Sequence, residues 1–266
     1  MTKINIAFGI TKDWFEHTCV TICSILSHSE NDEYKFFIMS DFDEEEFEKI
    51  FQEKCKILKS IYPKFEYEYV KMDNSDFYGI VHDKRVGVSA YYRLKLSSVT
   101  TVDKMIYLDS DLVVLSDIKE LWNYDIKNSL IAAVEDKYSA LMTCHANLAD
   151  DDIYFNSGVM IMNLKKFREQ NIEEKIFQKL NEENNDYSDQ DVLNDICRNQ
   201  ILYLPLKYNL MLTTDDPNAF PARKDEYNKA LKKPFILHYA IKPWILPVQY
   251  SEYWRKYFEV LSKFDK

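Results

Sequence analysis

The sequence contains only four glycines among its 266 residues: Gly9, Gly79, Gly87 and Gly158. Phosphate-binding loops and dinucleotide-binding motifs need several glycines at short, fixed spacing, because the backbone has to approach the phosphates closely. No such motif can be assembled from these four positions. If the protein handles phosphates, a metal ion and side chains must therefore make most of the contacts.

The sequence also lacks an excess of basic residues, paired cysteine motifs and long apolar runs, and each absence argues against a class of protein. The formal net charge is −10, so the basic surface of a nucleic-acid-binding protein is missing and we expect no nucleic-acid partner. The five cysteines show no Cys-x-x-Cys spacing, which favours buried free thiols in a reducing cytoplasm. No apolar run approaches the length of a membrane span, and charged residues interrupt any N-terminal signal peptide. We expect an acidic cytoplasmic enzyme.

A pair of carboxylates inside an apolar run is the clearest chemical signal in the chain. Asp109 and Asp111 interrupt a run of β-branched and aromatic residues between 105 and 115, which begins as a buried strand. Ionised carboxylates are costly to bury without a partner, and α/β sheets bind ligands at the carboxyl ends of strands. A divalent cation is therefore the expected partner. The alternative is that both acids cap the next turn, but two acids are more than a turn needs.

Strand and helix patterns alternate through the first half of the chain. The predicted strands are 4–10, 35–39 and 65–70, and the predicted helices are 15–26 and 44–61. This alternation is typical of a parallel sheet with helical crossovers. The polar segment 73–87 is expected to be mobile, and a short helix at 91–96 leads to the strand before Asp109.

The second half contains further short elements. Strands are predicted at 130–134, 201–204 and 235–238, and helices at 118–122, 167–184, 189–197 and 251–264. An Asn-Ser-Gly turn at 156–158 is predicted ahead of another buried strand that ends at Asn163. Ser188 and Asp191 have the spacing of a capping box, which predicts that a helix begins there. Without repeats or linkers, we expect one compact α/β unit.

Polar residues follow most of the predicted strands, where an α/β sheet would gather them in one crevice. They are Thr11, Asp13, Asp109, Asp111, Asp136, Asn156, Asp189, Gln190 and His238. Among them, Asp109, Asp111 and His238 can form half of a ligand shell for a divalent cation. Carboxylate oxygens suit Mg²⁺ or Mn²⁺, and the added imidazole favours Mn²⁺.

Five motifs occur in the order that is typical of one enzyme family. They are Tyr92-Arg93-Leu94, Leu108-Asp109-Ser110-Asp111, Phe155-Asn156-Ser157-Gly158-Val159, Asp189-Gln190-Asp191, and His238-Tyr239 with Lys242-Pro243-Trp244. With these motifs, nearly the whole chain resembles glycosyltransferase family 8. This family comprises retaining nucleotide-sugar transferases and includes bacterial lipopolysaccharide galactosyl- and glucosyltransferases and glycogenin.

The resemblance implies a GT-A fold, which is a mixed, mostly parallel α/β sheet flanked by helices. It implies a single domain over residues 1–266. A nucleotide-binding half would extend to about residue 115, an acceptor half would follow to about residue 245, and an aromatic and basic tail would occupy 246–266.

The resemblance also implies a role for each matching residue. Asp109, Asp111 and His238 are similar to the family's Mn²⁺ ligands, with Mg²⁺ as the second choice. Asp189 and Gln190 are similar to the catalytic residues beside the transferred sugar. The residues that resemble the donor-binding set are Gly9, Ile10, Thr11, Trp14, Arg93, Ser110, Asp136, Asn156 and Lys242.

The implied reaction transfers glucose or galactose from a UDP-sugar to a glycan acceptor, with retention, in lipopolysaccharide or other surface polysaccharide synthesis. Front-face attack and double displacement both stay open, although the amide of Gln190 would be a poor nucleophile. One alternative is a haloacid-dehalogenase-type phosphatase, which would leave Asn156, Asp189 and His238 unexplained. Another is a UDP-sugar-binding module with weak or no turnover.

The tail indicates a lipid-linked acceptor at the inner face of the cell membrane. Four residues recur at helical spacing and would form one face: Tyr250, Trp254, Tyr257 and Leu261. Together with Arg255 and Lys256, this face predicts a weak peripheral membrane contact through the tail. The alternative, that the same aromatic residues pack the last helix onto the fold, has equal support.

Overall fold

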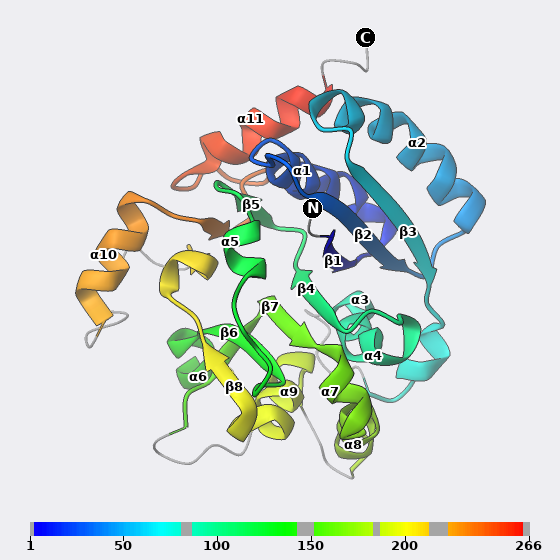
Figure 1. The fold of residues 1–266 in the computed structure, drawn as a ribbon, viewed down its shortest axis with the longest axis vertical. Helices are drawn as coiled ribbons and strands as arrows, with labels where there is room; N and C mark the ends of the chain where they lie inside the picture. Colours follow the sequence, from blue (N-terminus) through cyan, green and yellow to red (C-terminus); the bar gives the residue numbers. More distant parts are fainter. Residues whose placement is uncertain (1–2, 81–86, 143–151, 183–186, 213–222, 263–266) are drawn as a thin grey trace.

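The computed structural model describes residues 3–80, 87–142, 152–182, 187–212 and 223–262. Within these ranges, seven strands form one sheet in the order β3-β2-β1-β4-β7-β6-β8 (Figure 1). They are β1 (Lys3–Gly9), β2 (Glu33–Ser40), β3 (Phe65–Lys71), β4 (Lys104–Leu108), β6 (Ile131–Glu135), β7 (Phe155–Asn163) and β8 (Ile201–Tyr203). Strand β7 is antiparallel to both of its neighbours and the other pairs are parallel, so the prediction of a mixed, mostly parallel sheet is confirmed.

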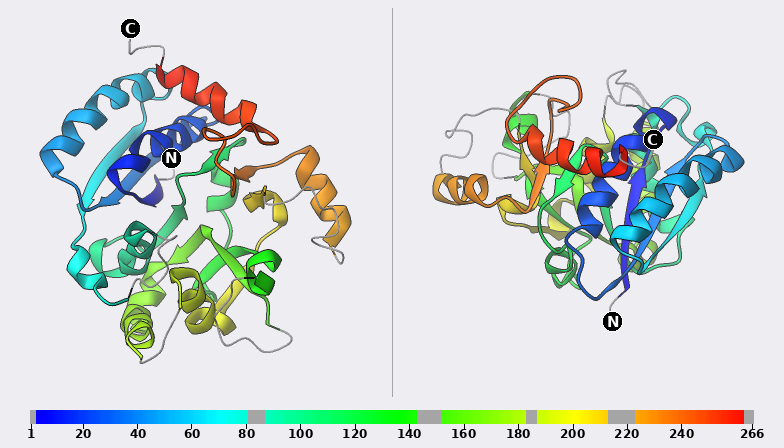
Figure 2. Two further views of the ribbon diagram at one scale, coloured as in Figure 1. Left: turned by 180° about the vertical axis from the view of Figure 1, so that it is seen from behind. Right: turned by 90° about the horizontal axis from the view of Figure 1, so that it is seen from above.

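Helices cover both faces of this sheet (Figures 1 and 2). One face packs against α1 (Phe15–Leu26), α2 (Glu44–Ile61) and α11 (Ser251–Ser262). The other packs against α3 (Val88–Tyr91), α4 (Leu96–Val99), α7 (Leu164–Glu169), α8 (Ile172–Leu180) and α9 (Asp189–Cys197). Successive residues of a strand face opposite sides, so Ile106 joins the first core and Tyr107 the second.

Shorter elements complete the described part of the chain. The helices are α5 (Lys119–Trp122), α6 (Lys137–Met142) and α10 (Lys224–Lys232). The 3-10 turns are η1 (Lys12–Trp14), η2 (Asn74–Phe77), η3 (Tyr92–Lys95), η4 (Arg198–Gln200) and η5 (Leu206–Asn209). Helix α10 was not predicted, and η2 gives local structure to part of a segment predicted to be mobile; residues 81–86 lie outside the described ranges.

The apolar run around the paired carboxylates divides between two sheets. After β4, the chain enters β5 (Leu112–Val114). In the described ranges, this strand forms a second, three-stranded sheet with β10 (Ile236–His238) and β9 (Leu210–Met211), in the order β5-β10-β9. Strands β5 and β10 are antiparallel, and His238 lies opposite Leu112. The amide N–H of Tyr239 also donates to the carbonyl oxygen of Asp111 at 3.0 Å. Backbone pairing therefore brings His238 beside Asp111 across a long sequence separation.

The Asn-Ser-Gly segment lies inside a strand, so its prediction as a turn was wrong. It belongs to β7, and the register with β6 shifts from Ala133 opposite Met160 to Val134 opposite Asn156. Such a bulge inserts extra residues and re-aims the side chains around it. The amide N–H of Asp109 donates to the carbonyl oxygen of Gly158 at 2.8 Å, so the bulge lies directly against the paired carboxylates.

The predicted helix at 167–184 is in fact two helices, α7 and α8. Helix α7 begins earlier, because Oδ1 of Asn163 accepts from the amide N–H of Lys166 at 3.1 Å and caps it. The chain then turns at Asn171, whose φ of 52° is left-handed, and α8 follows. Asparagine tolerates this conformation better than most residues, but the helical periodicity of the sequence did not reveal the break.

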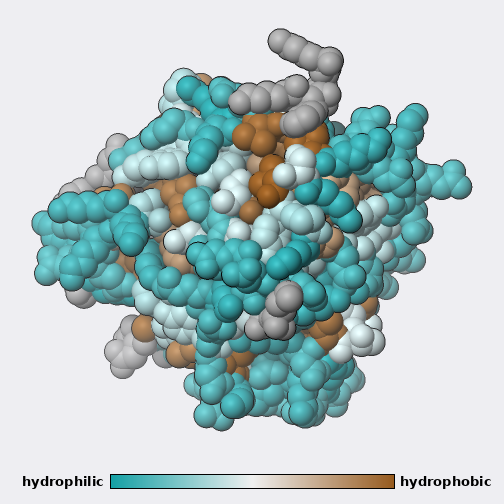
Figure 3. Space-filling view, turned by 45° about the horizontal axis from the view of Figure 1, so that its top comes forward, coloured by the Kyte–Doolittle hydropathy of each residue, from teal (hydrophilic) through white to brown (hydrophobic). Residues whose placement is uncertain are grey.

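The aromatic face predicted for the tail is turned towards the core. Trp254, Tyr257 and Leu261 are only 4%, 1% and 1% exposed, and α11 packs against α1 and α2 (Figure 2). These residues are therefore core residues and are not available to a membrane. Figure 3 shows a largely hydrophilic surface on one side of the molecule, with hydrophobic residues in separate patches. No helix of the described ranges is long and apolar enough to cross a bilayer.

Candidate functional site

Asp109, Asp111 and His238 lie together, as the sequence predicted. Each offers one ligand atom, and these atoms all lie within 4.8 Å of one another. Nε2 of His238 is 3.3 Å from Oδ1 of Asp111. That oxygen is buried, and among the described residues its polar neighbour is this nitrogen, which can donate to it only when protonated. A buried carboxylate oxygen without a donor is costly, so it is a suitable ligand for a cation.

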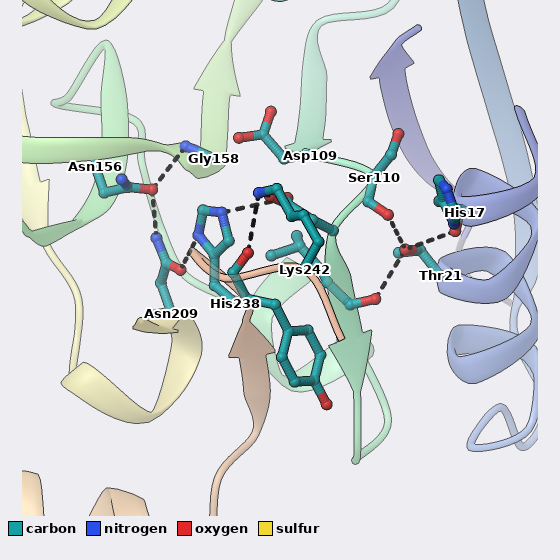
Figure 4. A network of polar contacts seen from close by, with 12 residues as sticks. His17, Thr21, Asp109, Ser110, Asn156, Gly158, Asn209, His238 and Lys242 are labelled. Atoms are coloured by element: carbon teal, nitrogen blue, oxygen red, sulfur yellow. Dashed lines mark hydrogen bonds and ion pairs between the residues drawn. The ribbon is translucent and has the colours of Figure 1, made fainter. Parts of the chain in front are cut away.

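The imidazole of His238 is held by Asn209, at the end of η5. Nδ1 of His238 and Oδ1 of Asn209 are 2.9 Å apart (Figure 4). Burial would lower the pKa of His238, but the carboxylate of Asp111 outweighs this effect and raises it. A cation that binds at Nε2 therefore has to compete with a proton, so its affinity should fall in acid.

Lys242 lies beside the same carboxylate. Its ammonium pairs with Oδ2 of Asp111 and donates to the carbonyl oxygen of Tyr239 at 3.0 Å. Burial would raise the pKa of Asp111, but His238 and Lys242 outweigh it and hold that pKa well below its usual range. Asp111 is therefore ionised at neutral pH, and its charge is balanced by groups from the last strand and the loop after it.

Arg93 connects Asp109, one of the three clustered residues, to helix α9. Its guanidinium is only 4% exposed and donates to Oδ1 of Asp109 at 2.7 Å. It also lies 3.2 Å from Oδ2 of Asp189 and donates to the carbonyl and hydroxyl oxygens of Ser157 at 2.7 and 2.8 Å. Burial raises the pKa of Asp189, although Arg93 opposes this shift. Most N–H groups of Arg93 are thus occupied by protein partners.

A second group of polar side chains surrounds Asp136, just after β6. Oδ2 of Asp136 accepts from Nδ2 of Asn156 at 3.1 Å and from Nε2 of Gln190 at 3.4 Å. Oε1 of Gln190 accepts from the amide N–H of Ser157 at 2.9 Å. These contacts fix the carboxamide of Gln190 at both ends.

The start of α9 keeps Asp189 and Gln190 in place. Ser188 caps the helix, since its hydroxyl accepts from the amide N–H of Asp191 at 3.1 Å. The carboxylate of Asp191 accepts from the amide N–H of Ser188 at 3.0 Å, which completes the predicted capping box. Asp189 and Gln190 therefore occupy the first turn of a helix whose start is firmly fixed.

The predicted nucleotide-side residues follow β1. A Cβ on Gly9 would lie 2.5 Å from the carbonyl oxygen of Ser89, so only glycine permits this approach of α3. The side chain of Ile10 is buried in the core, whereas Thr11 is partly exposed at the start of η1. Trp14 faces the ammonium of Lys242, which lies 5.6 Å from the centroid of the indole ring. Lys242 thus lies between Trp14, just after β1, and Asp111.

Ser110, between the two carboxylates, points towards α1. Its hydroxyl forms a 2.7 Å hydrogen bond with that of Thr18. Its carbonyl oxygen accepts from the hydroxyl of Thr21 at 3.3 Å (Figure 4). Thr21 also donates to the carbonyl oxygen of Leu112 at 2.8 Å. Helix α1 therefore anchors the link between β4 and β5, and Ser110 is directed into the protein.

The sequence did not single out three groups of site residues. Ser157 belongs to the motif at 155–159, but the family resemblance assigned it no role. In the structure it contacts Arg93 and Gln190. Thr18 and Thr21 lie on a correctly predicted helix, but nothing local shows that they face Ser110. Asn209 is the last residue of η5, a short turn that has no periodic pattern, so no sequence signal indicated it.

Comparisons with known proteins identify the family of the chain. A model of the family described as "Glycosyl transferase family 8" matches residues 5–245. General stress protein A of Bacillus subtilis (strain 168) is 33% identical over 208 residues, which cover 73% of this chain and 72% of that protein. Lipopolysaccharide 1,2-glucosyltransferase of Escherichia coli (strain K12) is 27% identical over 251 residues, which cover 91% of this chain and 72% of that protein.

A solved structure has a similar fold. The crystal structure of the galactosyltransferase LgtC in complex with donor and acceptor sugar analogs superposes with a TM-score of 0.74. The match covers 97% of this chain and 95% of that chain at 22% sequence identity. At this identity, the likeness supports the fold and not a particular substrate.

Replacing Gly158 by alanine should disable the cation site. The new Cβ would lie 2.6 Å from both Oδ2 of Asp109 and Cε1 of His238, so at least one ligand has to move. We expect Gly158→Ala to weaken Mn²⁺ binding at least about tenfold in calorimetric titrations. Gly87→Ala is the matched control, because its Cβ would lie 3.8 Å from the hydroxyl of Ser89. Unchanged Mn²⁺ affinity in Gly158→Ala would contradict the site.

Proposed function

The chain belongs to glycosyl transferase family 8 and has the GT-A fold, and we propose that it transfers a hexose from a UDP-sugar to a glycan acceptor with retention. The observation that carries this proposal is the cluster of Asp109, Asp111 and His238 where the two sheets meet. The similarity to a lipopolysaccharide glucosyltransferase supports glucose or galactose as the hexose. It also supports lipopolysaccharide or another surface polysaccharide as the product.

The three clustered side chains would hold Mn²⁺, with Mg²⁺ as the second choice. Their chemistry fits such an ion, because two carboxylates and an imidazole converge, and Oδ1 of Asp111 is buried with no hydrogen bond when the imidazole is neutral at Nε2. The missing side chain of Gly158 leaves space beside Asp109 and His238. When bound, the ion would act as a Lewis acid that stabilises the negative charge of the departing UDP.

Lys242 and Arg93 would act differently on the donor. Lys242 is paired with Asp111, so a cation on that carboxylate frees the ammonium to contact the diphosphate. Arg93 is buried and donates to Asp109 and Ser157, so it would act mainly by holding those residues and by its fixed positive charge. Direct donor binding by Arg93, which the sequence predicted, is therefore the weaker of the two assignments.

The nucleotide would bind beside the end of β1, in the half of the chain that ends near residue 115. Gly9 and Thr11 would line the uracil and ribose, with Trp14 beside the base. Ile10 and Ser110 would support this region from the protein interior, because the side chain of Ile10 is buried and the hydroxyl of Ser110 is hydrogen-bonded to Thr18.

The transferred sugar would lie against Asp136, Asn156, Asp189 and Gln190. Oε1 of Gln190 accepts from the amide N–H of Ser157, which further weakens an already poor nucleophile. This contact favours front-face attack. The acceptor oxygen then bonds to the anomeric carbon as the bond to UDP breaks on the same face. The leaving phosphate takes the acceptor proton, and Asp189 with Gln190 stabilises the positive sugar.

Two other activities have less support. A haloacid-dehalogenase-type phosphatase would carry its Asp-x-Asp motif near the N-terminus, whereas here three strands precede β4, the strand that leads to Asp109. That activity also gives no role to His238, which lies beside Asp111. A sugar-nucleotide-binding module without turnover would keep this geometry, and it would bind UDP-sugars without releasing UDP.

UDP binding should require the cation, and Asp111→Asn should abolish turnover. The substitution removes a negative ligand whose other oxygen pairs with Lys242. Calorimetric titration with UDP, in the presence of either Mn²⁺ or EDTA, measures the first effect. The release of UDP from UDP-glucose and from UDP-galactose measures the second. Asp103→Asn is the control, because Asp103 pairs with Arg168 and is mostly exposed. EDTA-resistant UDP binding together with full turnover of Asp111→Asn would overturn the metal assignment.

Replacing Gln190 by alanine should lower kcat while leaving the donor KM nearly unchanged. A residue that acts mainly in the transition state affects turnover more than binding, and we expect a loss of at least about 100-fold. Steady-state kinetics with the active donor measure both constants. Gln178→Ala on α8 is the control, because Gln178 bonds to Glu174 on an exposed face. A kcat equal to that of the parent would remove Gln190 from the mechanism.

A lipid-linked acceptor would meet the protein beside α11 rather than through its aromatic face, which is buried. Ile245 and Leu246 are 69% and 56% exposed, and a groove that they share with Trp254 also contains Arg255. We expect the parent to sediment weakly with anionic vesicles at low salt but not at high salt. Arg255→Glu/Lys256→Glu should abolish this binding. If the parent does not sediment at low salt, the tail is purely structural and a soluble acceptor is favoured.

A further inference from the structure

Asn209 joins the cation ligands to the predicted sugar-binding residues. It lies outside every motif of the sequence and is only 2% exposed. Its Oδ1 is 2.9 Å from Nδ1 of His238, and its Nδ2 donates to Oδ1 of Asn156 at 2.9 Å (Figure 4). Within the part of the chain that the structure describes, the buried carboxamide of Asn209 thus contacts both a candidate cation ligand, His238, and a predicted sugar-binding residue, Asn156.

The direction of these hydrogen bonds is set by the backbone. The amide N–H of Gly158 donates to Oδ1 of Asn156 at 2.9 Å, and Nδ2 of Asn156 donates to Asp136 at 3.1 Å. Because a backbone N–H can only donate, Oδ1 of Asn156 has to be an acceptor. Asn209 must therefore present its NH₂ group to Asn156.

The orientation of Asn209 then determines the tautomer of His238. With its NH₂ group on Asn156, Asn209 offers only an oxygen to the imidazole. Nδ1 of His238 must carry the hydrogen, and in the neutral ring the lone pair lies on Nε2. That nitrogen is the one beside Oδ1 of Asp111. The chain of hydrogen bonds from Gly158 thus leaves the correct nitrogen free for a cation.

We propose that Asn209 is a positioning residue that fixes His238 as an Nε2 ligand and couples the cation site to Asn156. The inference rests on the proposed function only in that a divalent cation binds at this cluster. Hydrogen-bond partners of ligating histidines commonly affect metal affinity about 10–100-fold when they are removed. A residue that only fills space would not show such a specific effect.

The test is Mn²⁺ binding to the full chain without nucleotide, measured by the electron paramagnetic resonance of free Mn²⁺. Asn209→Leu keeps the volume but removes both hydrogen bonds, and it should weaken binding about 10–100-fold. Asn209→Ser, whose side chain is too short to reach His238, should do the same and serves if the leucine variant does not fold. Asn209→Asp keeps an oxygen for Nδ1–H, and its Mn²⁺ affinity should stay within about threefold of the parent.

Donor kinetics of the aspartate variant test the coupling. In Asn209→Asp, the second carboxylate oxygen would face Oδ1 of Asn156, where the parent has an N–H group. Asn156 would lose this hydrogen bond, so kcat/KM for the UDP-sugar should fall at least about tenfold although Mn²⁺ still binds. Equal Mn²⁺ affinity in the parent and in Asn209→Leu or Asn209→Ser would overturn the inference, and so would equally weak binding by Asn209→Asp. A parent that binds no Mn²⁺ would instead overturn the proposed function.

Discussion

A buried carboxylate, Asp111, and a partly buried one, Asp109, have to be neutralised where the two sheets of this protein meet. Asp111 is buried beside His238 and Lys242, and Asp109 is bonded to Arg93. An ionised carboxylate in this setting is stable only if cationic groups or a metal ion compensate its charge. Partners from distant parts of the sequence meet this requirement, and their placement explains much of the remaining architecture.

The backbone brings these partners together by interrupting regular structure. The apolar run around Asp109 and Asp111 leaves the seven-stranded sheet after β4 and enters the three-stranded sheet as β5. There, antiparallel pairing with β10 places His238 beside Asp111. The bulge in β7 places Gly158 against Asp109 and directs Asn156 and Ser157 to their partners. The capped start of α9 then holds Asp189 near Arg93. Each irregularity positions polar groups that a regular strand or helix would not bring together.

Local patterns predicted the parts that depend on local chemistry. The helices at 15–26 and 44–61 have the bounds predicted from apolar spacing, and Ser188 forms the predicted capping box. The cluster of Asp109, Asp111 and His238 was also predicted, because strand ends gather polar residues. The bulge, the division of the apolar run around Asp109 and Asp111 between two sheets, and the role of Asn209 depend on pairing between distant segments. Periodicity in a single sequence carries no record of such pairing.

The proposed mechanism requires a divalent cation among Asp109, Asp111 and His238 when the nucleotide is bound. Anomalous diffraction from crystals grown with Mn²⁺ and UDP, collected on both sides of the manganese absorption edge, locates the ion directly. We expect one strong peak within bonding distance of Asp109, Asp111 and Nε2 of His238, with the ammonium of Lys242 moved off Asp111. Ordered UDP without a peak there, and with Lys242 still on Asp111, would contradict the proposed mechanism.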